Sequence, residues 1–166
     1  MHFGYGSTGI ENLVIELAKP FTKMSIRCMN YGQPMSATLW RQDGTGLEIS
    51  SEVHDVAEKR EVGNLLFALK HEISEVDSFF PENVYPSPLS AMKDLTVVKL
   101  TIFESGSSAE GGVLLTDEDG KSIAILTAAY PYCIATKGVS PEMDKFASEY
   151  DLDKYQQVIL SNRIAI

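Results

Sequence analysis

The sequence predicts a single α+β domain built around an antiparallel β-sheet, with a helix near the N-terminus and short helices near the C-terminus. Several segments alternate apolar and polar residues with a period of two, which is typical of strands with one buried face. Short Asp/Gly turns join some of these segments, and the intervals are too short for the crossover helices of a parallel sheet. The 166 residues fit one globular domain, residues 1–166, with a substantial core.

The N-terminal helix is predicted over Ile10–Lys19. Apolar residues recur there at helical spacing, namely Ile10, Leu13, Val14, Leu17 and Ala18. Thr8 and Glu11 have the spacing of a capping box, and Pro20 follows the predicted end. Residues 1–8 are expected to be a flexible lead-in. The Gly-x-Gly-x-x-Gly pattern over 4–9 is interpreted as part of a helix cap, because a nucleotide-binding loop of this kind must follow a strand.

Six strands are predicted from the period-two pattern and the turns between them. They cover Met24–Met29, Thr38–Trp40, Leu47–Ile49, Leu95–Phe103, Val113–Thr116 and Ile123–Thr127. Two pairs of these strands flank the turns Asp43-Gly44-Thr45-Gly46 and Asp117-Glu118-Asp119-Gly120. Glycine supplies the positive φ that a tight hairpin loop needs, so both turns predict hairpins.

The remaining segments have less regular patterns. Val53–Glu61 is rich in charge and is expected to be a helical turn or an irregular connection, while Leu65–Leu69 fits a strand or a helix. Three prolines predict a surface loop over residues 78–90, and Ser105–Gly112 is interpreted as a Gly/Ser turn. One or two short helices are expected between 141 and 166, where helical spacing relates Met143, Phe146, Tyr150 and Tyr155.

The charge balance favours a binding protein over a catalyst. The chain has 23 Asp and Glu against 14 Lys and Arg, which gives a formal net charge of −9. Such a surface repels phosphate backbones and anionic lipids, so neither nucleic acid nor membrane is an expected partner. It attracts a cationic protein instead. No recognisable catalytic motif accompanies the carboxylates, so neither enzymatic activity nor a cofactor is predicted.

The expected location is the cytoplasm. The N-terminal residues have neither the basic nor the apolar region of a signal peptide, and no apolar run reaches the ~18 residues of a spanning helix. Cys28 and Cys133 are the only cysteines. Both lie in apolar, strand-like surroundings, so we expect two free buried thiols rather than a disulfide.

The richest polar cluster is Glu52–Glu58. If this segment were helical, His54, Asp55 and Glu58 could hold a metal, which leaves a small metal-dependent hydrolase as an alternative function. No second histidine falls at ligand spacing, however. A solvated face with ion pairs to Lys59 and Arg60 is therefore the favoured interpretation, and no metal is predicted.

Candidate partner-binding residues are Asp117, Glu118, Asp119, Tyr130 and Tyr132. The segment Tyr130-Pro131-Tyr132 follows a predicted strand, and we expect its two rings to lie beside the acidic turn. Exposed tyrosines next to carboxylates suit protein recognition, since the rings bury area while their hydroxyls still form hydrogen bonds. Packing of one or both rings into the core is the alternative.

Two stretches of the chain carry a resemblance to a known group of proteins. One runs from Trp40-Arg41-Gln42-Asp43-Gly44 through Ser51–Glu58, and the other runs from Gly112 through Lys121 to Tyr130-Pro131-Tyr132. Both resemble small acidic immunity proteins of bacterial toxin–immunity systems, including contact-dependent growth inhibition. The resemblance implies a single cytoplasmic domain that binds and blocks a cognate toxin domain, often a nuclease with a basic cleft. A ligand-binding or scaffold domain is a third interpretation.

Overall fold

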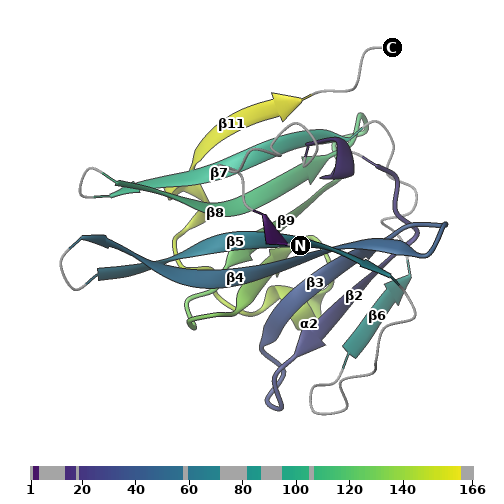
Figure 1. Cartoon of the computed structure of the whole chain (residues 1–166), viewed down its shortest axis with the longest axis horizontal. Helices are drawn as coiled ribbons and strands as arrows, with labels where there is room; N and C mark the ends of the chain where they lie inside the picture. Colours follow the sequence, from purple (N-terminus) through teal and green to yellow (C-terminus); the bar gives the residue numbers. More distant parts are fainter. Residues whose placement is uncertain are drawn as a thin grey trace.

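A computed structural model describes residues 2–3, 14–17, 19–57, 60–71, 82–86, 95–104 and 107–161. This part of the chain is mostly β and forms two antiparallel sheets packed face to face (Figure 1). One sheet has six strands in the order β1-β5-β4-β3-β2-β6, and the other has five in the order β10-β9-β8-β7-β11. The predicted antiparallel β-structure is therefore confirmed, although the strands form two sheets and not one.

The six-stranded sheet contains β1 (His2–Phe3), β2 (Lys23–Cys28), β3 (Pro34–Trp40), β4 (Thr45–Ala57), β5 (Arg60–His71) and β6 (Glu82–Pro86). The three predicted strands in this region are confirmed within β2, β3 and β4, and Leu65–Leu69 is a strand. The prediction for Val53–Glu61 was wrong where the structure describes it, because residues 53–57 lengthen β4 and residues 60–61 begin β5, while Glu58 and Lys59 lie outside the described residues. The loop predicted over 78–90 was also wrong in part, because β6 pairs with β2.

The five-stranded sheet contains β7 (Thr96–Glu104), β8 (Ser107–Thr116), β9 (Ser122–Thr127), β10 (Ile134–Lys137) and β11 (Gln156–Ser161). The three strands predicted here are confirmed in β7, β8 and β9. The Gly/Ser turn over Ser105–Gly112 was wrong, because β8 begins at Ser107. Between β10 and β11 lie the short helix α2 (Pro141–Asp144) and the 3₁₀ helix η2 (Leu152–Lys154), as expected, whereas β11 itself was not predicted.

Helix contributes little to the described chain. Of the helix predicted over Ile10–Lys19, Val14–Leu17 are helical, and Ile10–Leu13 and Ala18 lie outside the described residues together with Thr8 and the glycine pattern. The prediction of a flexible N-terminal segment was wrong for His2–Phe3, because these residues form β1 and pair with β5. In the part of the chain that the structure describes, no helix combines the length and the apolar character needed to cross a membrane.

The core lies between the two sheets. Alternate residues of β2, β4 and β8 point inward, and fully buried side chains include Met24, Ile26, Leu47, Ile49, Phe67, Val113 and Leu115. Each contributes roughly 1.5–3 kcal/mol by leaving water, which is why the period-two pattern is visible in the sequence. Cys28 and Cys133 are both buried and form no disulfide, as predicted.

Candidate protein-binding site

Three exposed tyrosines gather at one end of the sandwich. Tyr31 lies on the turn between β2 and β3, and Tyr130 and Tyr132 lie on the turn between β9 and β10. Their side chains are 58%, 53% and 64% exposed. The rings of Tyr31 and Tyr130 meet edge to face, with centroids 6.1 Å apart. We call Tyr31, Tyr130 and Tyr132 the tyrosine end, since turns from both sheets build it.

The turn that carries Tyr132 holds its backbone in an unusual conformation. The Cys133 N–H donates to the Tyr130 carbonyl at 3.3 Å, and the Ala128 N–H donates to the Cys133 carbonyl at 2.9 Å. Tyr132 has φ of 63°, at the turn position where glycine or asparagine is usual. A side chain in this region costs about 1 kcal/mol. Because the ring is exposed, core packing does not explain this cost, and a role in recognition is one explanation.

Two sulfur-containing side chains, Met29 and Cys133, lie close to the tyrosine end. Cys133 Sγ lies 3.6 Å from Met29 Sδ, and the Tyr31 hydroxyl lies 3.1 Å from the same sulfur atom. Burial raises the pKa of Cys133, so its thiol stays protonated and unreactive near neutral pH. Desolvation and the neighbouring Tyr130 raise the pKa of Tyr31, which therefore presents a neutral hydroxyl. The Gln33 side chain donates to the Ile134 carbonyl at 3.0 Å. This hydrogen bond links the turn between β2 and β3 to β10 of the five-stranded sheet.

A small cleft of about 160 Å³ opens beside Tyr132, between β4 and β5 on one side and the segment before β10 on the other. Ser51, Val53 and Gly63 line it from the six-stranded sheet. The opposite wall consists of Ala128, Ala129, Pro131 and Tyr132, and Glu149 also lines the cleft. Glu149 and the exposed Tyr132 therefore line the same cleft.

Glu149 bridges the two sheets. One carboxylate oxygen accepts hydrogen bonds from the Gly63 N–H and from the Thr127 hydroxyl, both at 3.1 Å. The Glu149 N–H donates to the Thr127 carbonyl at 2.8 Å, which fixes the residue against the end of β9. The side chain is half-buried. Among the described residues no lysine or arginine forms an ion pair with it.

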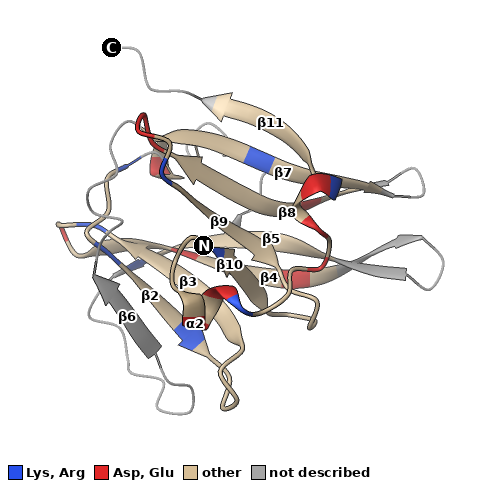
Figure 2. Cartoon of the chain, turned by 180° about the vertical axis from the view of Figure 1, so that it is seen from behind, with Lys and Arg blue, Asp and Glu red and all other residues tan. Residues whose placement is uncertain are grey.

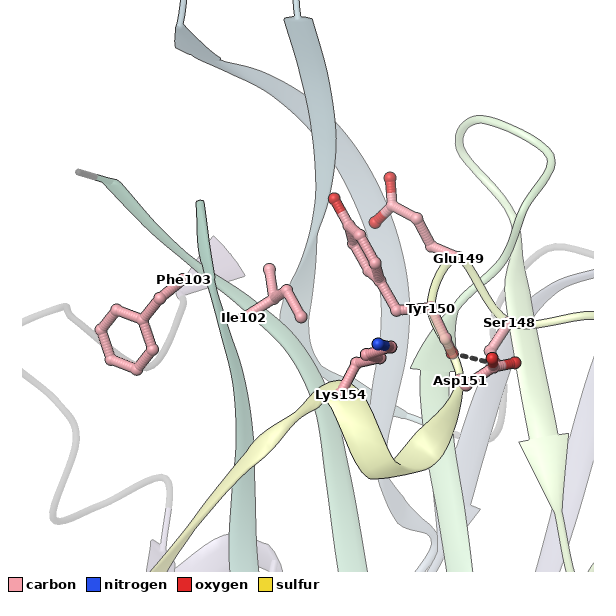
Figure 3. A pocket seen from close by; sticks show the side chains of 7 residues that line it. All are labelled: Ile102, Phe103, Ser148, Glu149, Tyr150, Asp151 and Lys154. Carbon is pink, nitrogen blue, oxygen red and sulfur yellow. Dashed lines mark hydrogen bonds between the residues drawn. The ribbon is translucent and has the colours of Figure 1, made fainter. Parts of the chain in front are cut away.

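A second, more open hollow of about 510 Å³ lies near Glu149, and its lining includes Ile102, Phe103, Tyr150, Asp151 and Lys154. Figure 3 shows that the Phe103 ring stands apart from the other side chains of this hollow. Ser148 Oγ donates to the Tyr150 carbonyl at 2.6 Å and stiffens the segment. Figure 2 shows that acidic residues predominate in the chain from α2 to β11. They are Glu142, Asp144, Glu149, Asp151 and Asp153, against Lys145 and Lys154.

The acidic turn does not lie beside the tyrosines, so that expectation was wrong. Asp117–Asp119 precede β9 and Tyr130–Tyr132 follow it, which separates the two turns by roughly 20 Å of strand. Asp117 is 6% exposed, and its carboxylate accepts hydrogen bonds from the Asp119 and Lys121 N–H groups. It therefore stabilises the turn, while Glu118 and Asp119 are exposed.

The segment that carried the metal alternative is not helical as far as it is described. His54 and Asp55 lie in β4 and pair with Val62 and Glu61, and Glu58 lies outside the described residues. His54 and Asp55 therefore do not lie on a helical face, because successive side chains of a strand point to opposite faces of the sheet. Within the described chain, no group of three or more His, Cys, Asp or Glu side chains is arranged to hold a metal ion.

Sequence reasoning missed two residues of this site, Tyr31 and Glu149. Tyr31 follows the β2 pattern in Met29-Asn30-Tyr31-Gly32, and the turn signal of Gly32 was available there, with φ of 96°. Nothing in the sequence placed Glu149 next to Gly63, because that contact spans 86 positions. Comparison with models of protein families, with curated proteins and with solved structures finds no match to this chain.

Proposed function

We propose that this chain is a non-catalytic immunity or inhibitor protein that binds and neutralises a cognate, basic, nuclease-type bacterial toxin domain in the cytoplasm. The observation that carries the proposal is the tyrosine end, where the exposed rings of Tyr31 and Tyr130 are in contact and the exposed Tyr132 lines a cleft together with Glu149. Tyrosines on tight turns lose little conformational entropy when they bind, and they are common among residues that dominate binding energy.

The overall charge supports a basic partner. A net charge of −9 attracts a cationic domain over a distance comparable to the Debye length and raises the association rate. The exposed Glu118 and Asp119 contribute to this field from the opposite end of β9. Direct contact is assigned to the tyrosine end instead, where aromatic area and a carboxylate occur together.

The proposal is tested by capture and then by kinetics. The chain is used as bait for the product of the neighbouring gene, and the captured protein is assayed for toxicity with and without it. Binding kinetics then compare the parent with Tyr31→Ala and Tyr130→Ala. Each truncation should raise the off-rate and weaken binding by about 2 kcal/mol or more, as expected for a central aromatic contact.

Phe103→Ala is the matched control, because Phe103 is 63% exposed, lies on β7 and does not line the cleft beside Tyr132. It should bind the toxin as the parent does. Equal weakening by Phe103→Ala and Tyr130→Ala would place the interface elsewhere. Failure of the chain to capture and neutralise any toxin domain would overturn the proposed function.

A further inference from the structure

We infer that the cleft beside Tyr132 is a socket for one lysine or arginine side chain, with the Glu149 carboxylate as its counter-charge. The inference rests on the proposed function for the identity of the partner. It adds the chemical feature that the partner inserts at the tyrosine end.

The size of the cleft selects a single side chain. Its volume of about 160 Å³ is well below the roughly 300–1,000 Å³ of ordinary small-molecule pockets. A nucleotide or a folded peptide turn does not fit such a space, whereas one extended side chain does. The cleft also opens directly beside Tyr132, so a partner that contacts the ring can reach into it.

The charge of the cleft selects a cation. Among the described residues that line it, Glu149 carries the only charge. Among the described residues, the Thr127 hydroxyl donates to one oxygen of this carboxylate, and the Gly63 N–H is shared between both oxygens at 3.1 and 3.3 Å. A carboxylate has about four lone-pair positions, so acceptor capacity is left over. The described chain supplies no lysine or arginine to neutralise it. A half-buried carboxylate with free acceptor positions is most strongly satisfied by a charged donor from outside.

The walls of the cleft fit the aliphatic stem of such a side chain. Val53, Ala128 and Pro131 contribute apolar side chains to the lining that they share with Glu149. Lysine and arginine bury their methylene groups along surfaces of this kind while the charged head finds a polar partner. Tyr132 also lines the cleft, and a cation within about 6 Å of an aromatic ring is attracted to the quadrupole of that ring.

The test uses Nα-acetyl-L-arginine amide as the probe and Nα-acetyl-L-citrulline amide as its neutral counterpart. The reporter is the backbone N–H resonance of Gly63, because this group donates directly to Glu149. Titration with the arginine amide should shift the Gly63 resonance in a saturable manner, and the citrulline amide should not. Glu149→Gln, which keeps the hydrogen-bond acceptor, should weaken binding at least about tenfold.

Glu118→Gln is the matched control, since it removes one exposed carboxylate at the far end of β9. It should bind the arginine amide like the parent. Absence of a saturable Gly63 shift, or equal shifts with both probes, would overturn the socket without bearing on toxin capture. A normal shift with the probe together with failure to capture any toxin would overturn the proposed function and leave the socket as a cation site. Unchanged toxin affinity in folded Glu149→Gln would show that the partner inserts no cation here.

Discussion

Gly63 on β5 and Thr127 on β9 touch across the two sheets. A methyl group added to Gly63 would lie 2.7 Å from Thr127 Cβ, closer than side-chain atoms approach without displacement. The Gly63 N–H and the Thr127 hydroxyl both donate to Glu149. The same close contact therefore joins the sheets and orients the carboxylate that faces the cleft.

Gly63→Ala is accordingly expected to destabilise the fold by about 1–3 kcal/mol, because an overpacked contact must shift backbone or side chain. The measurement is the free energy of unfolding in urea. Gly120→Ala is the comparison, since nothing lies within 4 Å of its added methyl group and its cost comes from a φ of 83° alone. An equal or smaller loss at Gly63 would show that the sheets separate easily there.

Tyr132→Gly is expected to change stability and binding in opposite directions. Glycine adopts φ of 63° without steric cost, so the fold should be unchanged or up to about 1 kcal/mol more stable. Loss of the ring should weaken toxin binding by about 2 kcal/mol, mainly through the off-rate. Urea unfolding and binding kinetics measure the two effects on one sample. A large loss of stability would show instead that the ring serves the fold.

The strands that were predicted from the sequence are those with one face in the core. The apolar residues Met24, Ile26 and Cys28 are buried and alternate with polar residues, as a strand with one face in the core requires. The far ends of β4 and β5 lack this pattern, and cross-strand backbone pairing defines them instead. The first part of β8 was taken for a turn because it contains glycines. Gly112 is needed there for packing, since a Cβ atom at this position would lie 2.6 Å from Leu126 Cδ2.

The candidate site could be predicted from the sequence only where the local sequence around a residue indicates an exposed turn. Tyr130 and Tyr132 flank a proline after a strand, and both are exposed. Their neighbours could not be predicted, because Tyr31 and Glu149 reach the site through long-range contacts from other turns. The acidic turn Asp117–Asp119 was wrongly predicted to lie beside Tyr130 and Tyr132, since the turn and the tyrosines lie at opposite ends of β9.

The metal content of the purified protein is the next prediction. His54 and Asp55 lie in a strand and not on the helical face that the metal alternative required of them. Protein prepared without chelator or added metal should contain far less than one equivalent of zinc or iron by elemental analysis. A stoichiometric metal that disappears in His54→Ala would restore the hydrolase alternative.

Salt should affect association more than dissociation. The net charge of −9 accelerates encounter with a basic toxin, and this steering is screened once ionic strength exceeds ~0.15 M. The on-rate is therefore expected to fall as salt rises, while the off-rate changes little because ring contacts dominate it. Stopped-flow or surface-binding kinetics at two salt concentrations measure both rates. A salt-independent on-rate would mean that the acidic surface plays no part in recognition.

Alkaline pH should destabilise the fold through Tyr155. Burial raises the pKa of Tyr155 to about 12, and its buried hydroxyl forms no hydrogen bond of normal geometry with a described residue, although Thr127 and the Tyr150 backbone lie near. An unfolded tyrosine ionises near pH 10, so between pH 10 and 12 the unfolded state binds fewer protons than the folded state. Stability that is fully present below pH 10 should therefore fall across this window, by up to about 2–3 kcal/mol.

Tyr155→Phe isolates this contribution. The variant should unfold like the parent at pH 7, since it removes a hydroxyl that makes no normal hydrogen bond and keeps the edge-to-face contact with Tyr150. Above pH 10 it should lose less stability than the parent, because phenylalanine has no proton to release. Urea unfolding at pH 7, 10 and 11.5 provides the comparison. Parallel losses in both proteins would assign the alkaline transition to other tyrosines or lysines and show that Tyr155 ionises without unfolding the chain.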